Sequence, residues 1–150
     1  MNDPARPPRL LLVNGPNLNL LGTREPDVYG TATLADVEQL VESTAAELGY
    51  QVTAVQSNHE GVLVDAIQEA RTSCAAVVIN AGAFTHTSVA IRDALTAVGL
   101  PVAEVHISNV HRREEFRSHS YLSGIAELVV VGGGIHGYAF AVQQLVRVLA

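Results

Sequence analysis

Two titratable side chains in one apolar run are spaced to form a proton-transfer pair. Glu104 and His106 are two residues apart within the run from Val102 to Ile107, and that spacing places them on one face of a β-strand. A carboxylate beside an imidazole fixes its tautomer and raises its pKa, as a general acid requires. The alternative is a structural histidine in the core. The glutamate partner and the position at a strand end favour the functional interpretation.

A tyrosine in the long segment of residues 15–33 is a second candidate. Tyr29 can act as a general base only if its pKa, ordinarily about 10, is lowered. One guanidinium at about 4 Å from a phenolate stabilises its charge by about 4 kcal/mol at an effective dielectric constant of 20. Lowering the pKa by one unit needs about 1.4 kcal/mol, so one or two arginines could bring the tyrosine near neutrality. Arg24 lies in the same segment, so we expect a lid that carries both residues. The alternative is a surface loop with a half-buried tyrosine.

Other polar side chains directly follow the remaining apolar runs. They are Asn14, Asn17, Asn58, His59, Asn80, His86, Ser108 and Asn109. Because the carboxyl ends of parallel strands meet at one edge of a sheet, we expect these side chains to form a small-molecule site there.

Two other kinds of site have weaker support. The six histidines include no His-Glu-x-x-His, and the one cysteine has no Cys-x-x-Cys partner, so a metal hydrolase is a minor hypothesis. Gly132, Gly134 and Gly137 match Gly-x-Gly-x-x-Gly. A nucleotide fingerprint also needs an acidic residue about 20 positions later, which this sequence lacks. We therefore interpret the glycines as allowing a close approach of the last helix to the sheet, with a nucleotide-binding module as the alternative.

Five short apolar runs recur along the chain, and most are followed by a stretch with helical spacing. The runs are Leu10 to Val13, Val52 to Val55, Ala75 to Ile79, Val102 to Ile107 and Leu128 to Val131. Strand and helix in alternation predict a parallel sheet between helices, with strands buried on both faces and right-handed crossovers. Five strands suggest a three-layer α/β fold of the flavodoxin-like kind, with strand order 2-1-3-4-5.

Periodicity and capping signals predict four helices. The first has Thr33 as its N-cap and Gly49 at its end, and the second contains Leu63 to Ala70. The others are Val89 to Val98 and Ile135 to Leu149, with only a short helical turn near Glu114 to Phe116.

The composition excludes several classes of protein. A chain of 150 residues with 48% apolar and 16% charged residues is a folded single domain, 1–150, with residues 1–8 as a flexible extension. All nine basic residues are arginine, so no lysine is present to form a Schiff base or to serve a P-loop. The net charge of −6 argues against nucleic acid as a partner. The apolar runs are too short for a signal peptide or a membrane span, so a cytoplasmic location is expected.

The segments together resemble type II 3-dehydroquinate dehydratase, the enzyme of the shikimate pathway that does not use a Schiff base. The resemblance covers nearly the whole chain from Leu11 onward. Its carriers are Asn14-Gly-Pro-Asn17-Leu18, Arg24-Glu-Pro26 with Tyr29-Gly30, Gln56-Ser-Asn-His-Glu-Gly61, Asn80-Ala-Gly82 with Thr85-His-Thr-Ser88, Glu104-Val-His-Ile-Ser-Asn109, and Arg113-Glu-Glu-Phe-Arg117 with His119-Ser120. Six ordered motifs at compatible spacing are far more specific than one glycine pattern.

The resemblance implies trans elimination of water from 3-dehydroquinate, giving 3-dehydroshikimate through an enolate, with no cofactor and no metal. It makes Tyr29 the base, as a tyrosinate held charged by Arg24 and Arg113. The residue that matches Asn17 holds a water that stabilises the enolate oxygen. His106, oriented by Glu104, protonates the leaving hydroxyl.

The resemblance also implies how substrate and subunits are held. Asn80 and the backbone amides of Ile107 and Ser108 bind the carboxylate, and Arg117 and His86 bind the ring hydroxyls. Arg113 contacts the substrate as well. Asp93 reaches the site of a neighbouring subunit, which implies trimers that assemble into a dodecamer; no nucleic acid and no membrane take part.

Overall fold

A five-stranded parallel sheet forms the middle of the computed structural model, which describes residues 5–23 and 25–150. The strand order β2-β1-β3-β4-β5 confirms the predicted one. The strands are β1 Arg9–Asn14, β2 Gln51–Gln56, β3 Ala76–Asn80, β4 Val102–His106 and β5 Leu128–Val131. Asn14 is in register with both Gln56 and Asn80. The carboxyl ends of three strands therefore lie level at one edge of the sheet.

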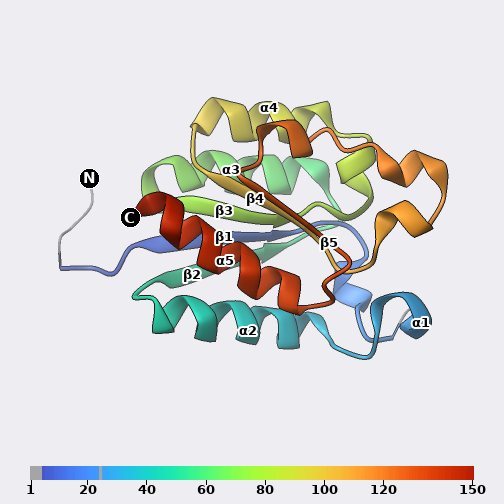
Figure 1. Ribbon diagram of the computed structural model, residues 1–150. Helices are drawn as coiled ribbons and strands as arrows, with labels where there is room; N and C mark the ends of the chain where they lie inside the picture. The colour runs from blue at the N-terminus through green and yellow to red at the C-terminus, as the bar shows by residue number, and fades with distance from the viewer. Residues whose placement is uncertain (1–4, 24) are drawn as a thin grey trace.

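Helices cover the sheet on both faces (Figure 1). α2 Leu34–Glu47 and α5 His136–Leu149 pack on one face, and α3 Glu60–Ser73 and α4 Val89–Val98 pack on the other. Alternate residues of β1 divide between the two cores, since Leu10 and Leu12 face α2 and α5 whereas Leu11 and Val13 face α3 and α4. This is the period of two that a doubly covered strand requires.

The prediction that every strand is buried on both faces is wrong for the edge strands. β1, β3 and β4 are almost wholly buried, whereas β2 and β5 are largely half-buried or exposed. Two helices of about 10 Å diameter span about 20 Å, less than the roughly 24 Å of five strands about 4.8 Å apart. The helices therefore cover the middle of the sheet and leave its edges partly exposed.

The predicted helix signals have local physical causes. The Thr33 side chain accepts a hydrogen bond from the Asp36 backbone N–H at 3.2 Å, and the Asp36 carboxylate accepts one from the Thr33 backbone N–H at 2.9 Å. This capping box starts α2 and lowers the pKa of Asp36. In α5, a Cβ on Gly137 would lie 3.0 Å from a methyl group of Val130. The close approach of the last helix to the sheet, predicted from the glycines, is confirmed.

Short helices lie in the connections at the carboxyl edge of the sheet (Figure 1). They are η1 Leu18–Leu20, α1 Pro26–Tyr29, η2 Gly82–His86, η3 Val110–Arg112 and η4 Glu115–Ser118. A further short helix, η5 Ser123–Ile125, directly precedes β5. The turn predicted near Glu114 to Phe116 corresponds to η4, but η1 and α1 were not predicted. A helix of three or four residues completes about one turn, too little to show a periodic apolar pattern. Within the described ranges, no helix combines the length and apolar character needed to cross a membrane.

Candidate active site

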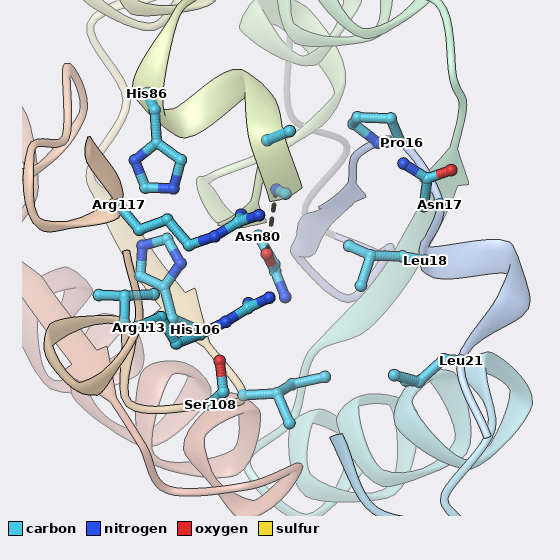
Figure 2. Close-up of a pocket in the computed structure, with 14 residues that line it drawn as sticks. Pro16, Asn17, Leu18, Leu21, Asn80, His86, His106, Ser108, Arg113 and Arg117 are labelled. Carbon is cyan, nitrogen blue, oxygen red and sulfur yellow. Dashed lines mark hydrogen bonds between the residues drawn. The ribbon is translucent and has the colours of Figure 1, made fainter. Parts of the chain in front are cut away.

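A pocket opens at the carboxyl edge of the sheet, in front of β3 and β4. Predicted residues that line it are Asn17, Asn80, His86, His106, Ile107, Ser108, Arg113 and Arg117. Pro16, Leu18 and Leu21 form the facing wall (Figure 2). The pocket has a cavity volume of about 100 Å³ and opens to solvent. A concave site with a few convergent polar groups suits a small organic molecule.

The Glu104 carboxylate lies directly behind His106 and is the centre of a buried network. Its Oε2 atom accepts a hydrogen bond from His106 Nε2. The Ser120 hydroxyl donates to Oε1 at 3.1 Å and to Oε2 at 2.9 Å, and the Ser123 hydroxyl donates to Oε1 at 2.7 Å. Burial opposes ionisation of Glu104, but the hydrogen bonds from His106, Ser123 and Ser120 and the charge of His106 outweigh it and lower the pKa.

The tautomer of His106 follows from this contact. An ionised carboxylate can only accept, so Nε2 of His106 carries a proton. The other ring nitrogen, Nδ1, is then the one that can exchange a proton with a molecule in the pocket that His106 lines. The geometry confirms the predicted pairing of the two side chains on one face of the strand.

Ser120 and Ser123 were not predicted as site residues. Besides binding Glu104, the Ser120 hydroxyl accepts hydrogen bonds from the backbone N–H groups of Leu122 at 3.0 Å and Ser123 at 3.1 Å. It therefore fixes the loop that brings Ser123 to the carboxylate. Ser120 belongs to the His119-Ser120 motif, so the sequence contained a signal that could have identified it as a site residue. The contact of Ser123 with Glu104 depends on the path of the loop, which no local sequence pattern indicates.

His86, on η2, has an equally defined tautomer. Its Nδ1 atom lies 2.7 Å from the carbonyl oxygen of His119, which can only accept, so Nδ1 donates the proton. In the neutral ring, Nε2 is then an acceptor. An acceptor on the pocket wall is suited to a ligand hydroxyl group.

The two asparagines of the pocket are held from behind. The backbone N–H of Asn17, which has a left-handed conformation with φ of 67°, donates to Asn58 Oδ1 at 3.0 Å. The Asn80 side chain donates from Nδ2 to the hydroxyl of Tyr138 at 2.9 Å, and Tyr138 donates to Asn14 Oδ1 at 2.7 Å. Complete burial raises the pKa of Tyr138, so this phenol is neutral. Neither contact was predicted from the sequence.

The pocket is cationic although the chain has a net charge of −6. In Figure 2 the guanidinium groups of Arg113 and Arg117 point toward its centre. Glu114 accepts a hydrogen bond from Arg117 Nε, which lowers the pKa of Glu114. Among the described pocket-lining residues, none carries a carboxylate. The local field therefore favours a small anion.

Of the other predicted site residues, one is described away from the pocket lining and two cannot be placed in it. Asp93 is exposed on α4 and does not line the pocket of its own chain. Arg24 and the side chain of Tyr29 lie outside the described residues, although the α1 backbone that ends at Tyr29 is at the same end of the sheet as the pocket (Figure 1). Over residues 5–23 and 25–150, no cluster of three or more His, Cys, Asp or Glu side chains is arranged to hold a metal ion.

Fold and site together define a class of protein. A flavodoxin-like sheet carries a cationic pocket at its carboxyl edge, and a buried Glu104–His106 pair can move a proton there. This arrangement suits an enzyme that performs acid–base chemistry on a small organic anion.

Comparison with known proteins identifies the family. The model of the family Dehydroquinase class II matches residues 8–146. Catabolic 3-dehydroquinase 2 of Aspergillus flavus is 64% identical over 137 residues, 91% of each chain, and 3-dehydroquinate dehydratase of Herminiimonas arsenicoxydans is 57% identical over 141 residues, 93% of this chain and 97% of that one. The crystal structure of type II dehydroquinase from Butyrivibrio crossotus superposes with a TM-score of 0.89 at 43% identity, covering 92% of this chain and 97% of that one.

The chain belongs to the class II dehydroquinase family. Membership of this family means dehydration of 3-dehydroquinate, a hydro-lyase reaction of the shikimate pathway. The predicted family, fold class and enzyme class are confirmed.

Proposed function

We propose that this chain converts 3-dehydroquinate to 3-dehydroshikimate by trans elimination through an enolate, without cofactor or metal. The observation that carries the proposal is the buried, ionised Glu104 bound to His106 on the wall of a cationic pocket. A dehydratase needs a group that protonates a leaving hydroxyl, and a histidine held by a carboxylate is suited to this step. His106 donates this proton from Nδ1.

The substrate carboxylate is bound by the Asn80 side chain and the backbone amides of Ile107 and Ser108. All three residues line the pocket. Arg117 and His86 bind the ring hydroxyls, and the acceptor Nε2 of His86 supports this assignment. Arg113 contributes a second cation in the same pocket.

The proton next to the ketone is removed by Tyr29 as a tyrosinate, which Arg24 and Arg113 keep charged. The family resemblance supports this assignment, and so does the position of α1 at the carboxyl edge of the sheet. Asn17 holds the water that stabilises the enolate oxygen. An arginine beside the phenol lowers its pKa because it favours the charged form.

The active form is a cytoplasmic dodecamer built from trimers, with the chain as a single domain. Asp93 belongs to this proposal, since it is exposed on α4 and does not line the pocket of its own chain. In the assembly it completes the site of the neighbouring subunit.

The direct test is the ultraviolet absorbance of the conjugated product formed from 3-dehydroquinate. Turnover should survive chelation, and it should survive borohydride treatment of enzyme incubated with product and then freed of reagent, because no lysine is present to be trapped. Tyr29→Phe should abolish turnover, whereas Tyr50→Phe, which changes a tyrosine on the α2 and α5 side of the sheet, should keep it. More than a tenth of the wild-type kcat in Tyr29→Phe would contradict the assigned base.

A further inference from the structure

A chain of buried polar side chains runs from α5 to the back of the pocket. The Tyr138 hydroxyl donates to Asn14 Oδ1 at 2.7 Å and accepts from Asn80 Nδ2 at 2.9 Å. Tyr138 and Asn14 are completely buried, and Asn80 is 4% exposed. A buried polar network costs stability where a member is unpaired, and Nδ2 of Asn14 has no hydrogen-bond partner within the described residues. The position of this network beside the pocket therefore points to a role in function.

The directions of these hydrogen bonds set the orientation of the Asn80 amide. A tyrosine hydroxyl has one hydrogen, and Asn14 takes it, so the oxygen of Tyr138 is left to accept from Asn80. At the other end of the same amide, Oδ1 of Asn80 accepts from the Gly82 backbone N–H at 3.1 Å. The two ends of a carboxamide have nearly the same shape, so only such partners distinguish them.

We propose that Tyr138 is a positioning residue for recognition of the substrate carboxylate. By accepting one N–H of Asn80, it keeps the nitrogen end of the amide beside the pocket. The second N–H of Nδ2 makes no hydrogen bond within the described part of the chain and is available to a ligand. A reversed amide would present its carbonyl oxygen to a carboxylate and repel it. The inference rests on the proposed function, in which Asn80 binds that carboxylate.

The first test compares Tyr138→Phe with Tyr50→Phe, which removes the same atom from a half-buried tyrosine of the same core. Tyr138→Phe should raise KM for 3-dehydroquinate about tenfold, the effect of a lost hydrogen bond to a charged group, and keep kcat within about twofold. Tyr50→Phe should keep both constants. An unchanged KM in a folded, active Tyr138→Phe protein would overturn the inference, as would an equal fall of kcat in both variants.

A double-mutant cycle shows whether Tyr138 acts through Asn80. In the Asn80→Ala background, Tyr138→Phe should add less than about twofold to KM, because the amide that it orients is gone. A product of the two single effects would instead mean that Tyr138 acts independently, and would overturn the inference.

A second route keeps the inference testable if Tyr138→Phe does not fold. Asn14→Ala removes the carboxamide whose oxygen orients the phenol hydrogen, and it should raise KM about threefold at constant kcat. An unchanged KM in this variant would count against the inference. Wild-type protein without dehydratase activity would contradict the proposed function itself, which separates the two failures.

Discussion

Glu104 shows how a buried carboxylate is kept charged. Burial alone would raise its pKa, yet hydrogen bonds from His106, Ser123 and Ser120 stabilise the ionised form and lower it. An ionised Glu104 can hold a protonated His106, whereas a neutral carboxyl group would lose that attraction. The two serines therefore help to keep Glu104 ionised without lining the pocket.

Replacing Glu104 by Gln should change both catalysis and the pH dependence of stability. The pKa of Glu104 is lower in the folded protein than in the unfolded chain, so its ionised form stabilises the fold. This stabilisation is complete above the pKa of the unfolded chain and is lost as the pH falls through the pKa of the folded protein. Glu104→Gln should therefore lose less free energy of unfolding than wild type between neutral and acid pH. Its kcat should fall about a hundredfold, since the general acid loses its charged partner.

Urea unfolding at several pH values and steady-state kinetics measure these two effects. The matched control is Glu127→Gln, because Glu127 is an exposed carboxylate. If the free energy of unfolding of Glu104→Gln falls as steeply at acid pH as that of wild type, Glu104 does not cause the acid dependence of stability.

At this scale the sequence predicted contacts between near neighbours and missed distant ones. Glu104 and His106 are two residues apart, so the strand period alone pairs them. Tyr138 meets Asn80 and Asn14 across sequence separations of 58 and 124 residues. The sequence placed Tyr138 only within the predicted helix Ile135 to Leu149, and nothing local indicates what its hydroxyl binds.

At the scale of elements, the loop after β2 holds the loop after β1. The Asn58 side chain accepts from the Asn17 backbone N–H at 3.0 Å, and the Gln56 side chain donates to the Gly15 carbonyl at 3.1 Å. Asn17 has the left-handed conformation that non-glycine residues adopt rarely. The contact with Asn58 stabilises this conformation and with it the direction of the Asn17 side chain.

Asn58→Ala should reduce kcat by about threefold, because Asn17 loses the acceptor that fixes its backbone. Asn58→Asp keeps an oxygen at the same place and should retain near wild-type turnover. Steady-state kinetics on the two variants measure the difference. Equal losses in Ala and Asp would show that the Asn58 amide nitrogen, not its oxygen, matters.

Long elements were predictable because their signals are local. Thr33 and Asp36 form the capping box at the start of α2, and Gly49, with φ of 84°, follows its end. By contrast, η1 and α1 have no more than four residues each, and the start of η1 is held by the contact of Asn17 with Asn58, 41 residues away in sequence. The segment expected as a lid therefore contains more regular structure than its sequence indicated.

At the scale of the whole molecule, net charge and local charge have opposite signs. The chain carries −6 overall, yet Arg113, Arg117 and two histidines surround the pocket. The prediction from composition that nucleic acid is not a partner stays a prediction. Composition gave no sign of an anion site, since the site depends on which side chains the sheet edge brings together. Asp93 was assigned from the family resemblance alone, because an exposed helix carboxylate has no local mark of function.

Subunit mixing tests the proposed role of Asp93 in the assembly. If Asp93 completes the site of a neighbouring subunit, Asp93→Ala should lower kcat/KM about tenfold, while Tyr29→Phe removes the base of its own site. In co-refolded oligomers of the two variants, a site is intact when its own chain carries Tyr29 and its neighbour carries Asp93. Random assembly of equal amounts then restores roughly a quarter of wild-type activity, against about a twentieth for a mixture of separate homo-oligomers. Native mass measurement verifies that the subunits have exchanged. If activity then stays near a twentieth of the wild-type value, Asp93 serves only its own chain and the sites do not share residues.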